Sequence, residues 1–395
     1  MERIVFYILT TIHIWLEKTQ ALLSKSWFPF TILNPLGYII PNWNQVSISK
    51  PSMYRTFVFT NFLLGKAFII GGHNSGTHVG TVIDLSNGKL CEPFEEVNFS
   101  KLYSPSVGVV DQSYLIVCNG IGKVQEKSCE ILDGNQRKHE KIPTDIVRFG
   151  TAIQWSDSSL WITGSVEDKS TIVVSRSGYK PGPDLPEIRF GHCGLRIDSK
   201  TAIIIGGMVK KEPYDSYKLY GYQGQSTKTT QYFDFVSYTW SQGPDMINAR
   251  VGEFGCTMAT LNDQSMIVVA NGIDKVWTQG YVYAVLPTMV FSWILRFYRL
   301  QQVEMLNLAT NQWKNIPWTN GKYERGIALF SFENKLYRFG GARFQKSVMV
   351  LDCGVHDCEN CPNCENKWEF VESFLDIGRL QPGYTLIPEN LAKCN

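Results

Sequence analysis

The stretch that decides the fold is "TAIIIGG", Thr201–Gly207, a short apolar run that ends in two glycines. Five other segments end in the same way or in a remnant of the pair: "KAFIIGG" to Gly72, "SYLIVCNG" to Gly120, "SLWITG" to Gly164, "SMIVVANG" to Gly272 and "KLYRFGG" to Gly341. Successive end points are 48, 44, 43, 65 and 69 residues apart. Recurrence at such an interval indicates a repeat architecture. The last two intervals indicate the same period with insertions.

Other residues recur in phase with the glycines. An alternating strand follows each glycine mark, and then a turn leads to an aromatic residue in the later units: Tyr179, Trp240, Trp313 and Trp368. An arginine opens the next unit: Arg148, Arg189, Arg250, Arg325 and Arg379. Each unit therefore reads as four short strands. A four-stranded sheet cannot bury its own faces, so we expect neighbouring sheets to stack around an axis, with the tryptophans wedged between them.

This pattern resembles the kelch repeat, in which a glycine pair is followed by an apolar strand and a tryptophan. The resemblance runs from about Phe57 to Pro388, and its intact marks are Gly71, Gly72, Gly206, Gly207, Gly340, Gly341, Trp240, Trp313 and Trp368. It implies an all-β fold, a six-bladed kelch-type β-propeller over residues 54–390, with four antiparallel strands per blade. After Arg379, "LQPGYTLIP" is similar to another innermost strand, so we expect the C-terminus to close the ring by completing the first blade.

Composition and motifs narrow the function classes. The formal net charge of +2 over 395 residues argues against nucleic acid as a partner. Hydrolase, P-loop and dinucleotide motifs are absent from the sequence. His73 and His78 share a loop, but a third metal ligand is not evident nearby, and an exposed loop pair is the better interpretation. Some similar propellers oxidise sugars with a copper tyrosine–cysteine centre, and the sequence offers no ligand set for it. We therefore expect no cofactor and no catalysis.

The N-terminus carries an apolar leader. Residues 1–50 read as a leader and linker, and the apolar run from Ile4 to Leu16 has signal-peptide length, with 1–21 as the candidate signal. A leader without structure is the alternative. Asn98 begins a glycosylation sequon, and ten cysteines suit an oxidising compartment. We expect secretion, with a cytoplasmic protein as the alternative.

Two insertions interrupt the repeat. Residues 209–228, "VKKEPYDSYKLYGYQGQSTK", are polar and rich in tyrosine. Residues 281–300, "YVYAVLPTMVFSWILRFYRL", are apolar but too short for a comfortable span, and Pro287 interrupts them. Removing 281–300 restores ordinary spacing, so one hypothesis is retained non-coding sequence. The other is a hydrophobic loop that docks to a membrane or a partner.

The resemblance also predicts a binding face. It places the arginines Arg148, Arg189, Arg250, Arg325 and Arg379 around the central channel, with Lys123, Lys275 and Arg343 in the loops after the glycines. Such a rim would attract an acidic peptide or another carboxylate. The alternative is that each arginine serves the fold alone. We expect a monomeric, non-enzymatic, stand-alone interaction propeller without BTB or BACK domains, which binds a protein partner. The other function class is a propeller enzyme or carbohydrate-binding protein of the extracellular space.

Cysteine spacing leaves alternatives open. Cys353, Cys358, Cys361 and Cys364 stand in the loop before Trp368, and their spacing favours disulfides over a zinc site or free thiols. Cys118 and Cys129 fall on consecutive strands and could face each other. Cys193 and Cys256 are interpreted as small core residues.

Overall fold

The computed structural model separates the chain into two compact units, residues 1–51 and residues 52–395. The first unit, with the candidate signal peptide, lies outside the residues that the structure describes. The described residues are 57–59, 65–72, 80–91, 105–118, 128–133, 138–144, 150–165, 167–210, 218–219, 222–285, 288–299, 303–316, 326–341, 347–353, 355–356, 358, 367–371 and 383–388. They contain strands and turns and no helix.

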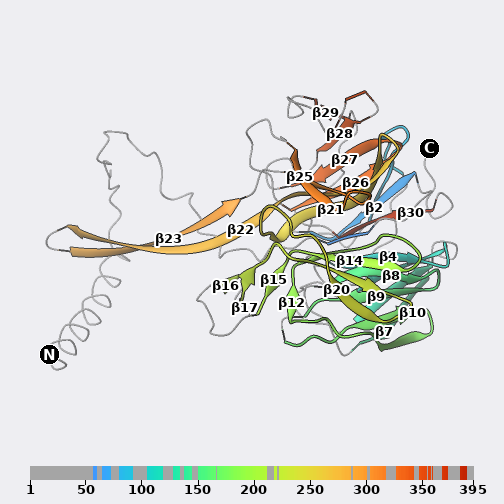
Figure 1. The fold of residues 1–395 in the computed structure, drawn as a ribbon, viewed down its shortest axis with the longest axis horizontal. Coiled ribbons are helices and arrows are strands. Elements are labelled where there is room, and N and C mark those ends of the chain that lie inside the picture. Colours follow the sequence, from blue (N-terminus) through green and yellow to red (C-terminus); the bar gives the residue numbers. More distant parts are fainter. Residues whose placement is uncertain are drawn as a thin grey trace, which may run out of the picture. The chain divides into compact units, whose positions relative to one another are not determined.

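Six sheets of four or five strands make up most of the second unit (Figure 1). We number them along the chain, each given from its first strand outward. Sheet 1 is β1 (Phe57–Phe59), β30 (Gly383–Ile387), β2 (Lys66–Ile70) and β3 (Thr81–Asp84); sheet 2 is β4 (Ser106–Val110), β5 (Tyr114–Cys118), β6 (Ser128–Asp133) and β7 (Lys138–Pro143); sheet 3 is β8 (Thr151–Ser156), β9 (Ser159–Thr163), β10 (Ile172–Ser175) and β11 (Gly178–Pro181). Sheet 4 is β13 (Cys193–Arg196), β14 (Thr201–Ile205), β19 (Thr230–Asp234) and β20 (Thr239–Gln242); sheet 5 is β21 (Val251–Leu261), β22 (Gln264–Val285), β24 (Val303–Asn307) and β25 (Gln312–Ile316), with β23 (Thr288–Arg299) paired to β22; sheet 6 is β26 (Ile327–Phe332), β27 (Lys335–Gly340), β28 (Val348–Asp352) and β29 (Glu369–Phe370).

The glycine marks Gly72, Gly164, Gly207 and Gly341 follow β2, β9, β14 and β27, whereas Gly272 lies inside the long strand β22. Gly206 and Gly207 have φ angles of 58° and 96°, which favour glycine over any residue with a Cβ atom. A Cβ on Gly207 would also lie 2.7 Å from the Cβ of His192 and 2.8 Å from the carbonyl oxygen of Phe190. Positive φ recurs at Gly72, Gly164, Gly272 and Gly341. At these marks the backbone adopts a conformation that favours glycine, and at Gly207 the neighbouring chain leaves no room for a Cβ atom.

Neighbouring sheets pack through apolar faces. β4 contacts β8, β8 contacts β13, β13 contacts β21, β21 contacts β26, β26 contacts β30, and β30 contacts β4. Buried clusters join sheets 1 and 2, sheets 2 to 4, and sheets 5 and 6. Two of the tryptophan marks reach the preceding sheet: Trp240 Nε1 donates to the Asp184 carbonyl (2.9 Å), and Trp313 Nε1 donates to the Pro244 carbonyl (2.9 Å). The described chain is thus all-β, with packed antiparallel sheets of the kind found in β-propellers.

The C-terminal strand belongs to sheet 1. β30 pairs antiparallel with β2, with Ile70 opposite Gly383 and Lys66 opposite Ile387. This is the pairing that the expected closure by "LQPGYTLIP" requires. On its other side β30 pairs parallel with β1, so sheet 1 departs from the expected four antiparallel strands.

The apolar insertion 281–300 extends a hairpin of sheet 5. β22 pairs with β24 over Met266–Ala270 and with β23 from Ile273 to Val285. The part that pairs only with β23 runs beyond the sheet as a two-stranded ribbon (Figure 1). The hairpin is compatible with both hypotheses about these residues.

Candidate functional site

Arg189 occupies a closed position at the glycine end of sheet 4. Its side chain is 0% exposed, and it donates to the carbonyls of Gly206 (2.7 Å) and Thr229 (3.2 Å) and to Thr229 Oγ1 (2.7 Å). Glu187 provides the counter-charge. Burial lowers the pKa of the Arg189 guanidinium, and Glu187 opposes that shift. The guanidinium therefore ties the glycine turn to the start of β19.

Arg250 occupies the matching position one unit later, with a fully buried partner. Arg250 donates to Glu304 Oε1 (2.7 Å) and to the Asn271 carbonyl, and both charged side chains are 0% exposed. The Glu304 carboxylate also accepts from the backbone N–H of Ile247 (2.7 Å) and from Asn248 Nδ2 (3.0 Å). A buried pair of this kind holds the strand ends together, because every charge has hydrogen-bonding partners.

These contacts correct the expected arginine rim at two positions. Arg189 and Arg250 cannot meet a ligand, since their guanidinium groups are buried and bonded to their own chain. Here the structural interpretation of the repeat arginine holds. Arg148, Arg325, Arg379, Lys123 and Arg343 lie outside the described residues, and Lys275 lies in β22 without a described side chain.

His192 lies beneath the same turn. Its ring is fully buried, and Nε2 forms a 2.9 Å hydrogen bond with Thr163 Oγ1 in sheet 3. Burial lowers the pKa of His192 well below its ordinary value, and the charge of Arg189 acts in the same direction. His192 is therefore a neutral interior residue that joins sheets 3 and 4.

The tyrosine-rich insertion 209–228 begins and ends next to Arg189 and Gly207. β15 (Met208–Val209) pairs with β12 (Arg189–Phe190) and with β18 (Gln225–Ser226), which forms a three-stranded sheet at the start and end of the insertion. Within it, β16 (Lys218–Leu219) pairs with β17 (Tyr222–Gln223). The Thr227 N–H donates to the Gly207 carbonyl (2.9 Å). The two ends of the insertion are thus held in place by hydrogen bonds to each other and to the glycine turn.

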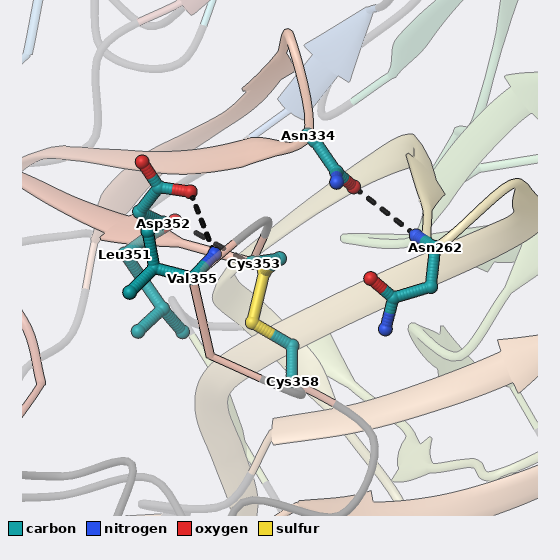
Figure 2. The surroundings of a disulfide bond; sticks show 7 residues. All are labelled: Asn262, Asn334, Leu351, Asp352, Cys353, Val355 and Cys358. Atoms are coloured by element: carbon teal, nitrogen blue, oxygen red, sulfur yellow. Dashed lines mark hydrogen bonds between the residues drawn. A yellow bond between two sulfur atoms is a disulfide. The ribbon is translucent and has the colours of Figure 1, made fainter.

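The cysteine-rich loop after β28 contains a disulfide (Figure 2). Cys353 and Cys358 are bonded to each other and are both 1% exposed. Val355 N–H donates to Asp352 Oδ1 (3.3 Å), and Asn334 Oδ1 accepts from Asn262 N–H (3.1 Å), which links sheets 5 and 6. The minority interpretation as a four-thiolate metal site is wrong for this pair, because disulfide sulfurs are not free thiolates. Cys361 and Cys364 lie outside the described residues.

Two other disulfides join pairs of cysteines that the structure describes. Cys118 and Cys129 are directly opposite on β5 and β6 and are bonded, which is the pairing that the sequence suggested. Cys193 and Cys256 are buried in the core as expected, and they are also bonded to each other, which the sequence did not suggest. They lie on β13 and β21, first strands of neighbouring sheets, so equivalent repeat positions come within disulfide reach. Cys91 is disulfide-bonded as well, and no cysteine is free in the described part of the chain.

Sequence reasoning missed two features. Glu304 is a single acid within the apolar strand "VEMLN", and that mismatch was a signal for a buried ionic partner. A "GPD" motif recurs at Gly182–Asp184 and Gly243–Asp245. In both copies a threonine of the same sheet, Thr171 or Thr230, donates its hydroxyl to the proline carbonyl at 2.8 Å. These motifs supply the carbonyls that the next sheet's tryptophan contacts.

The described ranges contain neither a metal-binding cluster nor a membrane-spanning helix. Those residues hold no group of three or more histidine, cysteine or acidic side chains able to bind a metal ion. They also include no helix of the length and apolarity needed to cross a bilayer. Asn98, His73 and His78 lie outside them.

Comparison with known proteins supports the fold alone. No protein-family model matches the chain, and no curated protein matches it in sequence. Among solved structures, one titled "Structure of YjhT" superposes with a TM-score of 0.55 at 11% identity, covering 81% of this chain and 98% of that chain. At this identity the likeness concerns the arrangement of strands and not the activity.

Proposed function

We propose that the protein is a secreted, non-enzymatic β-propeller of the kelch type that binds a protein partner through the face at the glycine ends of its sheets. Six packed sheets support a six-bladed ring closed by β30, because their strands β4, β8, β13, β21, β26 and β30 contact one another in a series that returns to its start. The three disulfides between described cysteines support an oxidising compartment.

The observation that carries the binding proposal is the double contact of Arg189. One buried guanidinium donates to the Gly206 carbonyl before the insertion 209–228 and to the Thr229 carbonyl after it. Holding both ends of a loop lowers the entropy that the loop loses on binding. A variable segment on a rigid scaffold is the usual way in which folds of this kind carry recognition.

The composition of the insertion indicates the chemistry of the partner. Its tyrosines, Tyr214, Tyr217, Tyr220 and Tyr222, are residues enriched in protein interfaces. It has four lysines against one glutamate and one aspartate. An acidic protein surface therefore fits it best, which keeps the charge preference expected from the repeat arginines and moves it to a different segment.

The test replaces residues 211–223 with a short Gly-Ser linker and compares the proteins retained by each form from extracellular fluid of the source organism. The matched control is Tyr238→Ser, which changes a tyrosine that is 60% exposed in the turn at the opposite end of sheet 4. We expect retained proteins to be lost with the loop replacement and kept with Tyr238→Ser. Equal retention by all three forms would contradict the proposal.

A further inference from the structure

Sheet 1 is assembled differently from the other five. In sheets 2 to 6 one neighbour of the glycine-ended strand is the strand that directly precedes it in the chain. In sheet 4, for example, β14 pairs antiparallel with β13. In sheet 1 that place beside β2 is taken by β30, from the other end of the chain. We call this place, beside β2 on the side away from β3, the closure slot.

The chain holds a second segment suited to the closure slot. β4, β8, β13 and β26 begin 14, 13, 14 and 14 residues before the last glycine of their units. β1 begins 15 residues before Gly72, so it stands where the repeat places a first strand. Its sequence "FVF" has the aromatic and β-branched residues that favour strands.

The structure places β1 next to the closure slot and not in it. Phe57, Val58 and Phe59 pair in parallel with Gly383, Tyr384 and Thr385 of β30. β1 also contacts β4, β8, β13, β21 and β26, the first strands of the other five sheets. Because β1 is parallel to β30, it is already antiparallel to β2. Entering the slot needs a sideways shift of one strand spacing, about 4.8 Å, and no reversal of direction.

We propose that β1 and β30 are alternative occupants of the closure slot. β30 fills it in the described state, and β1 is a reserve strand that pairs with β2 when the C-terminal strand withdraws. The hydrogen bonds that β2 loses to β30 are then replaced by bonds to β1, so sheet 1 survives the release of the C-terminus. Spacing in the repeat aligns Val58 with Cys193, and the Cys193–Ile205 pair predicts Val58 opposite Ile70. This inference concerns closure and is independent of where a partner binds.

The experiment uses proline, which removes a backbone donor and breaks a central strand. Full-length Thr385→Pro, Val58→Pro and the double variant are compared by hydrogen exchange of the β2 amides, Lys66–Ile70. Thr385 pairs with Phe68 in the centre of β2. The matched control is Val109→Pro in β4, which pairs with β5, the next strand along the chain, and it is made with and without Val58→Pro.

We expect Val58→Pro alone to leave β2 protected and Thr385→Pro alone to raise its exchange by no more than about tenfold. The double variant should raise exchange at least about a hundredfold, since both occupants are lost. Val109→Pro should disrupt sheet 2 equally with or without Val58→Pro. The proposal is overturned if Thr385→Pro alone exposes β2 as fully as the double variant does. It is also overturned if the single Thr385→Pro variant does not fold at all.

Discussion

At the scale of single residues, the buried Arg250–Glu304 pair separates a structural arginine from a binding one. Arg250→Ala leaves the Glu304 carboxylate inside the protein without its charge partner. We expect a loss of about 3–5 kcal/mol in the free energy of unfolding. The control Lys228→Ala breaks a pair with Asp245 whose side chains are 53% and 40% exposed, and should cost less than about 1 kcal/mol. Denaturant unfolding measures both, and similar losses would argue against this role of Arg250.

His192 predicts an acid-sensitive fold. Its pKa is lowered in the folded state, so only the unfolded chain takes up this proton as the pH falls below about 6.5. The contribution is complete above that pH and is lost below it, with a slope of up to about 1.4 kcal/mol per pH unit. The His192→Gln variant lacks this proton uptake, so its free energy of unfolding should fall less steeply than that of the original protein between pH 7 and pH 5. Parallel pH profiles for the two proteins would rule out this source of acid sensitivity.

The residue scale also shows where sequence reasoning stops. The glycine marks could be recognised in the sequence because these positions need positive φ. At Gly207 a close backbone neighbour also excludes a Cβ atom. The arginines were readable as repeat marks, but their position inside or outside the protein was not. Burial depends on Glu187 and Glu304, which are brought to the arginines by the fold. No spacing rule in one sequence indicates that pairing.

At the scale of elements, the disulfides should differ in their contribution. Cys193–Cys256 closes 63 residues and Cys353–Cys358 closes 5. Loop-closure entropy predicts a loss of about 4 kcal/mol for the double serine variant of the first and about 2 kcal/mol for the second. Thermal and denaturant unfolding of the two variants test this order. A larger loss at Cys353–Cys358 would show that its buried packing outweighs the loop entropy.

The hairpin of sheet 5 gives a prediction about its own necessity. The ladder between β22 and β24 uses Met266–Ala270 and Val303–Asn307, and none of residues 281–300 takes part in it. Deleting 281–300 should therefore leave the melting temperature unchanged within a few degrees. The hypothesis that these residues derive from retained non-coding sequence predicts a transcript that joins the codons of Gly280 and Gln301. An uninterrupted message that encodes the insertion would refute that origin.

At the scale of the whole molecule, the repeat predicted more than the individual sites. The all-β class, the short antiparallel sheets and the pairing of the C-terminal strand with β2 follow from six glycine marks and a seventh first strand. The position of β1 beside β30 could not be predicted from the sequence. Both β1 and β30 suit the closure slot, and their local sequences do not show which of them occupies it. The Cys193–Cys256 bond likewise depends on which first strands become neighbours.

The central claim is that the C-terminal strand completes sheet 1 and thereby closes the ring of sheets. Hydrogen exchange of the peptide containing Gly383–Ile387, measured in the full-length folded protein, tests it most directly. We predict protection comparable to that of β4 and β13, first strands of sheets 2 and 4. Exchange of Gly383–Ile387 at the rate of an unstructured peptide, while β4 and β13 stay protected, would contradict it.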